Sequence, residues 1–104
     1  MLENGDTRMR IQERIFHSRE EILRIAAKHG AWNVRLFGSV LVESVENPHD
    51  VDFLVEMDKG HSLLDRIALI QDLEDLLQCQ VDVISERGLH RFIKDQVLEN
   101  AQPL

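Results

Sequence analysis

The sequence predicts a small α/β (α+β) domain in which a short, mixed, three-stranded sheet is packed against helices. Two observations lead to this fold class. Segments with helical periodicity alternate with short apolar segments that have the period of a strand. The chain has 104 residues, of which 43% are hydrophobic. That length supports one hydrophobic core and leaves little material for a separate substrate-binding domain.

The first clear helix is predicted over residues 19–29. Ser18 precedes it and Glu21 follows three residues later, which is the pattern of a capping box. Gly30 comes next, and a glycine in the left-handed conformation commonly ends a helix. Apolar residues at helical spacing predict a weaker helix over residues 8–16. We therefore place an N-terminal extension, helical in part, at 1–17 and the domain at 18–104.

Three strands are predicted, over residues 34–37, 50–57 and 80–85. In the second strand, Val51, Phe53 and Val55 alternate with other residues, which is typical of a strand with one face in the core. Two further helices, over 62–78 and 89–100, follow from apolar residues spaced three and four apart. Trp32 precedes the first strand and is expected to be a packing residue.

The chain is acidic, with 19 Asp and Glu against 12 Lys and Arg and a formal net charge of −7. Proteins that coat nucleic acid rely on clustered basic residues, so broad nucleic-acid binding is disfavoured. No apolar run approaches the roughly 20 residues of a membrane span, and the charged residues 1–14 lack the apolar core of a signal peptide. The sequence therefore predicts a cytoplasmic protein, and its single cysteine, Cys79, fits a reducing compartment.

Three aspartates occupy strand segments where a core-building sequence would have Val or Ile. They are Asp50, Asp52 and Asp82. Two carboxylates about 4 Å apart repel by about 4 kcal/mol at an effective dielectric constant of about 20, so such a cluster needs a compensating cation. Mg²⁺ suits one or two carboxylates together with the phosphates of a substrate.

A glycine and a serine follow the first strand, where a backbone without a Cβ and a hydroxyl can hold phosphate oxygens. These residues are Gly38 and Ser39, and ten residues separate them from Asp50 and Asp52. This pattern, with Asp82 on a later strand, resembles the signature of the DNA polymerase beta-like nucleotidyltransferase superfamily.

Size, element order and the closing stretch 92–104 are similar to those of the minimal nucleotidyltransferases, the MNT antitoxins. The resemblance covers residues 22–104. It implies the antitoxin of a type VII toxin–antitoxin pair, which transfers AMP from ATP to a hydroxyl, typically of a tyrosine, on a cognate HEPN ribonuclease toxin. Carried over by position, Gly38 and Ser39 would hold the triphosphate. Asp50, Asp52 and Asp82 would be the catalytic residues and the ligands of two Mg²⁺ ions.

One departure from the family pattern keeps other functions open. The family often has an Arg and a Gly shortly after the Gly-Ser pair, and residues 40–44 contain neither. Arg35 and Lys59 are the candidate substitutes, although solvation at the surface is the role expected of both. The alternatives are an antitoxin that masks the toxin by stoichiometric binding and a small-molecule nucleotidyltransferase. Whether the chain forms a homo-oligomer is also left open.

Overall fold

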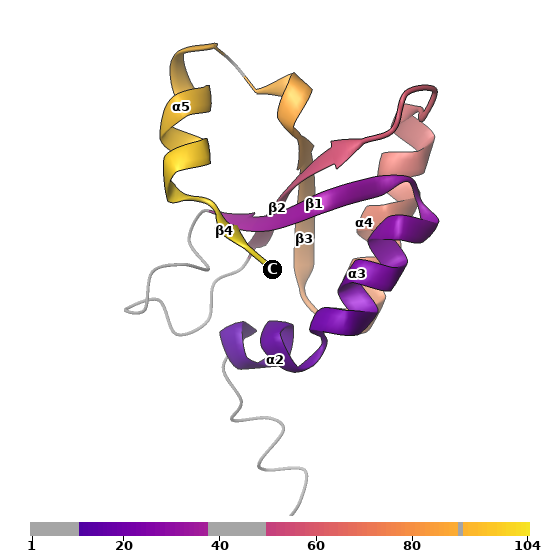
Figure 1. Cartoon of the computed structure of the whole chain (residues 1–104). Coiled ribbons are helices and arrows are strands. Elements are labelled where there is room, and N and C mark those ends of the chain that lie inside the picture. Colours follow the sequence, from indigo (N-terminus) through magenta and orange to yellow (C-terminus); the bar gives the residue numbers. More distant parts are fainter. Residues whose placement is uncertain (1–10, 38–49, 90) are drawn as a thin grey trace, which may run out of the picture.

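A computed structural model describes residues 11–37, 50–89 and 91–104, with the backbone alone for residues 50 and 91–93 (Figure 1). The helices are α2 (Ile11–His17), α3 (Arg19–Lys28), α4 (Leu63–Leu77), the short 3₁₀ helix η2 (Glu86–Gly88) and α5 (Arg91–Asn100); the strands are β1 (Ala31–Phe37), β2 (Asp50–Met57), β3 (Gln80–Ser85) and β4 (Gln102–Pro103). No helix in these ranges is both long and apolar enough to cross a membrane.

The sheet has the strand order β3-β2-β1-β4. Strands β2 and β3 are parallel, whereas β1 is antiparallel to both β2 and β4. The fold class is confirmed, but the predicted count of three strands was wrong by one. The fourth strand has two residues, one of them Pro103, and is too short to show an alternating pattern.

Strand β1 begins three residues earlier than predicted. Its pairing with β2 shifts register between Trp32 and Arg35, and Asn33 lies there with a φ of 51°. Such a bulge inserts one extra residue and interrupts the alternation of faces. Trp32 is therefore a strand residue, and 52% of its surface is exposed, so its expected packing role was wrong.

One face of the sheet packs against α2, α3 and α4 (Figure 1). Val51, Phe53 and Val55 are almost fully buried in this core, which confirms the predicted face of β2. Helix α2 contributes Ile11 and Ile15 to the same core. The boundary between an extension at 1–17 and a domain at 18–104 stays a prediction.

Of the two end signals predicted for α3, the structure confirms the one at the C-terminus and contradicts the one at the N-terminus. Gly30 has a φ of +79°, as predicted for the residue that ends this helix. The predicted capping box was wrong, because the Ser18 side chain makes no capping hydrogen bond. Glu21 instead forms an ion pair with Arg24 at 2.8 Å, one helical turn further along.

The capping box occurs at α4, between Ser62 and Asp65. Oδ2 of Asp65 accepts hydrogen bonds from the Ser62 backbone N–H at 2.8 Å and from its hydroxyl at 3.3 Å. The backbone hydrogen bond is the main reason why the pKa of Asp65 lies below its ordinary value of 3.8. The carboxylate therefore caps the helix in its ionised form.

This cap predicts a pH-dependent contribution to stability. The folded state lowers the pKa of Asp65, so the contribution is complete above the unfolded value of 3.8 and is lost as the pH falls through the folded-state pKa. We expect Asp65→Ala to lower the urea midpoint at neutral pH and to have a smaller effect in strong acid. Urea unfolding of both chains along a pH series measures this, and an equal difference at every pH would contradict the assignment.

Candidate active site

The parallel pairing of β2 with β3 places Asp52 directly opposite Asp82. The neighbours of each aspartate in its own strand are buried in the core: Val51 and Phe53 in β2, and Val81 and Val83 in β3. Successive side chains of a strand point to opposite faces. Both aspartates therefore lie on the sheet face that is turned away from the core.

The two aspartates differ in exposure. Asp82, on the edge strand β3, is exposed, whereas Asp52, on the inner strand β2, is half-buried. Oδ1 of Asp82 accepts a hydrogen bond at 2.9 Å from the backbone N–H of Val83. This bond fixes one oxygen, and the carboxylate keeps further lone pairs for a ligand.

Asp50 begins β2, where it pairs with Gln80. It lies two residues before Asp52, and its backbone alone is described. Gly38 and Ser39 lie outside the described residues. Phe37, the last residue of β1, pairs with Asp52 on the side opposite Asp82. The structure thus brings Asp52 and Asp82 together and runs β1 to the same end of the sheet.

Adjacent carboxylates on one face of the sheet fit a divalent cation. Neighbouring strands are about 4.8 Å apart, and two negative charges at that spacing repel unless a cation offsets them. Carboxylate oxygens are the ligands that Mg²⁺ prefers. Among the side chains that the structure describes, no group of three or more His, Cys, Asp or Glu is arranged around a metal position. A third ligand would have to come from Asp50 or from the substrate.

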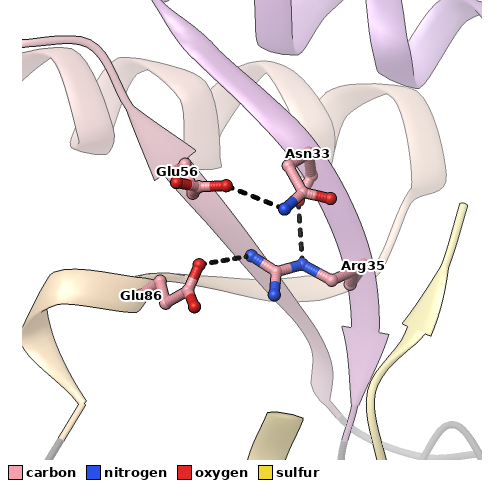
Figure 2. A network of polar contacts seen from close by, with 4 residues as sticks. All are labelled: Asn33, Arg35, Glu56 and Glu86. Carbon is pink, nitrogen blue, oxygen red and sulfur yellow. Dashed lines mark hydrogen bonds and ion pairs between the residues drawn. The ribbon is translucent and has the colours of Figure 1, made fainter.

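Arg35 does not stand in for the missing family arginine. Only 9% of its surface is exposed, and it forms an ion pair with Glu86 at 3.1 Å (Figure 2). Its Nε also donates to the backbone oxygen of Asn33 at 3.0 Å. The expectation of a solvated or phosphate-binding Arg35 was therefore wrong. The sequence signal for this role is Glu86, an acidic residue directly after β3. Strand β3 ends at the same end of the sheet at which β1 begins.

Lys59, the other candidate substitute, follows β2 at the end opposite to the aspartates. Met57, the last residue of that strand, is five positions after Asp52, and five positions along a strand span about 17 Å. Lys59 therefore lies too far from the acidic pair to contact the same phosphate group.

Comparisons with known proteins agree with this arrangement. A family model described as a nucleotidyltransferase domain matches residues 19–104. A proposed protein adenylyltransferase of Methanocaldococcus jannaschii is 36% identical over 83 residues, which cover 80% of this chain and 89% of the relative.

Solved structures extend the comparison. The structure of a proposed minimal nucleotidyltransferase is 42% identical in sequence and has a TM-score of 0.80. The match covers 92% of this chain and 97% of the matched chain. A complex of tri-AMPylated Shewanella oneidensis HEPN toxin with MNT antitoxin matches with a TM-score of 0.62 at 21% identity, over 81% of this chain and 66% of the matched one. At that identity the likeness concerns the fold.

Proposed function

We propose that this chain, which belongs to the nucleotidyltransferase domain family, transfers AMP from ATP to a hydroxyl group of a HEPN toxin protein. The observation that carries the proposal is the direct opposition of Asp52 and Asp82, on the sheet face turned away from the core, with Asp82 exposed. The identity to a proposed protein adenylyltransferase supports a protein as acceptor. The complex of an MNT antitoxin with an AMPylated HEPN toxin supports the class of that acceptor.

The reaction is a displacement at the α-phosphorus of ATP. The acceptor oxygen forms a bond to this phosphorus, the bond to the β-phosphate oxygen breaks, and pyrophosphate leaves. Asp82, as the exposed carboxylate, would accept the proton of the hydroxyl. Asp50 and Asp52 would hold Mg²⁺ together with Asp82, and Mg²⁺ when bound stabilises negative charge on the entering and leaving oxygens.

The remaining residues of the proposed site bind the nucleotide. Gly38 and Ser39 would hold the triphosphate through backbone N–H groups and the serine hydroxyl. They follow Phe37, which is paired with Asp52, so the chain leaves β1 beside the acidic pair. That the acceptor residue is a tyrosine and that the protein is cytoplasmic both stay predictions.

Intact-protein mass spectrometry tests the proposal. The purified chain is incubated with ATP, Mg²⁺ and a HEPN toxin protein from the same source. We expect the HEPN protein to gain mass in steps of one adenylyl group, and peptide mapping to place the group on a hydroxyl side chain. A HEPN protein that binds the chain and stays unmodified would refute the transfer.

Stoichiometric masking is the second candidate, and the state of Arg35 favours it. Residues 40–44 contain no arginine, and Arg35 is engaged by Glu86. A site with less positive charge stabilises the charge that develops on phosphate less well. Masking predicts that the toxin is inhibited without ATP and at a fixed molar ratio, which an RNA-cleavage titration in the absence of nucleotide measures.

A further inference from the structure

The end of the sheet opposite to the acidic pair carries two adjoining pockets. The larger, of about 290 Å³, lies between the β2–α4 loop, α4 and η2 and is lined by Lys59, Leu63 and Arg66 among others. The smaller, of about 230 Å³, contains Trp32 and Lys94. Met57 and Arg87 line both, so the pockets form one surface, which we call the distal surface.

Basic side chains outnumber acidic ones on the distal surface, although the whole chain has a net charge of −7. They come from four different elements and are Lys59, Arg66, Arg87 and Lys94. Within the described part of the chain, no ion pair joins any of them to a carboxylate. Arg66 donates only to the backbone oxygen of Val83, at 3.4 Å.

The carboxylates of the smaller pocket are engaged inside the protein (Figure 2). Glu86 is paired with Arg35 at 3.1 Å, and Glu56 accepts a hydrogen bond from the Asn33 side chain at 2.8 Å. The charge of Glu86 is therefore already matched by Arg35, whereas Glu56 and, in the larger pocket, Asp58 keep their negative charge, so four cations face two carboxylates that no described ion pair neutralises. The distal surface presents its cations to whatever binds there.

Exposed apolar side chains adjoin these cations. Leu63, Leu64 and Ile67, within the first five residues of α4, are 60%, 75% and 40% exposed. Trp32 is 52% exposed at the other side of the surface. Large apolar residues, tryptophan and arginine gathered in one place are the composition of an interface core and its anchor residues.

We propose that the distal surface docks the acceptor protein, through a segment whose apolar side chains are flanked by carboxylates. The inference rests on the proposed function, since the partner is the protein that receives AMP. Apolar side chains would cover Leu63, Leu64 and Ile67, and carboxylates would pair with the free cations. The acidic pair begins about 17 Å away along β2, so docking leaves the nucleotide site open for the acceptor hydroxyl.

A symmetric second copy fits the distal surface less well than a different protein. In an isologous dimer the same patch meets itself, so the four cations of one copy would face those of the other. Like charges placed together in an interface oppose association. The charge of this surface thus favours an acidic partner segment.

Binding and transfer are measured separately to test the docking. Leu64→Ser/Ile67→Ser removes apolar contact, and Arg87→Glu reverses one charge. Phe16→Ser, at a side chain 71% exposed on α2, and Lys28→Glu, at an exposed position of α3, are the matched controls. Circular dichroism confirms the fold of each variant. Isothermal titration calorimetry with the HEPN protein gives Kd, and mass spectrometry gives the transfer rate.

We expect both distal variants to raise Kd and the KM for the HEPN protein at least tenfold, with kcat within about twofold of the original chain. The controls should bind normally. Unchanged affinity in both distal variants would overturn the docking surface even if transfer proceeds. Conversely, weakened binding by a chain that never transfers AMP would sustain the surface and refute the proposed function.

Two further measurements test whether a second copy of the chain or a small anion, rather than the HEPN protein, occupies the distal surface. Sedimentation velocity that shows a dimer of the chain alone, abolished by Leu64→Ser/Ile67→Ser, would give the surface to a second copy and overturn the proposal. Calorimetry with sodium pyrophosphate that shows binding lost in Arg87→Glu, while the HEPN protein binds this variant normally, would give it to a small anion and also overturn the proposal.

Discussion

Replacing Asp52 with asparagine is expected to reduce the rate of AMP transfer by on the order of a hundred- to a thousandfold, the range found when one group that stabilises a transition state is lost. Asparagine keeps the size of the side chain and removes the charge that offsets the metal. Because Asp52 faces Asp82 across one strand pair, Asp82→Asn should cause a loss of similar size. Thermal unfolding should change little, since neither side chain belongs to the hydrophobic core.

Asp75→Asn is the matched control, because Asp75 is an exposed aspartate of α4, a helix that packs on the core face of the sheet, whereas the acidic pair lies on the other face. Single-turnover mass spectrometry with saturating ATP gives the rates. An Asp52→Asn chain that transfers AMP normally would contradict the proposed site. If this variant loses transfer and still silences the toxin, masking explains the antitoxin activity, and the second candidate is the correct one.

Replacing Phe53 with alanine is expected to cost about 3–5 kcal/mol of stability, the usual range for a buried phenylalanine. The side chain is 0% exposed and lies on the core face of β2. For a domain of this size, this loss corresponds to a fall in Tm of roughly 12–40 °C, at about 4–8 °C for each kcal/mol. Differential scanning calorimetry measures the change.

Phe53→Leu is the comparison variant, since it keeps most of the apolar volume and should cost much less. The two variants also test the link between core and site. Phe53 follows Asp52, and its burial fixes which face of the sheet the aspartate occupies. At a temperature where Phe53→Ala is folded, its transfer rate should match that of the original chain. A large loss of stability in both variants alike would point to a defect in β2 itself.

Regular periodicity made most of the fold predictable from sequence. Strand β2 shows a clear alternation, and its predicted bounds, 50–57, match those in the structure. The long helix α4 was predicted from its apolar spacing, whereas its capping box, Ser62 with Asp65, was not predicted. Strand β4 was not predicted, because its existence depends on pairing with β1 rather than on a pattern of its own.

The candidate site was predictable in part. Their place in apolar strand patterns and the resemblance to a family singled out Asp52 and Asp82, and the structure pairs the two residues across β2 and β3. The role of Arg35 was not predicted, because its ion pair with Glu86 joins positions far apart in the chain and depends on the order of the strands in the sheet. The bulge at Asn33 likewise hid the first residues of β1, including Trp32. Local sequence patterns indicate which face of a strand or helix is buried and where the element ends. Which distant residues pair with one another can be seen only in the folded structure.

The position of β3 at the edge of the sheet has a consequence for how the activity responds to heat. Among the described strands only β2 pairs with β3, and further hydrogen bonds to β3 come from side chains of α4: Glu74 accepts from the Val81 N–H at 3.0 Å and Arg66 donates to the Val83 oxygen at 3.4 Å. Edges open at lower free energy than the middle of a structure. Warming that frays this outer strand would separate the acidic pair while β1, β2 and the helices remain folded, so inactivation should precede the main calorimetric transition.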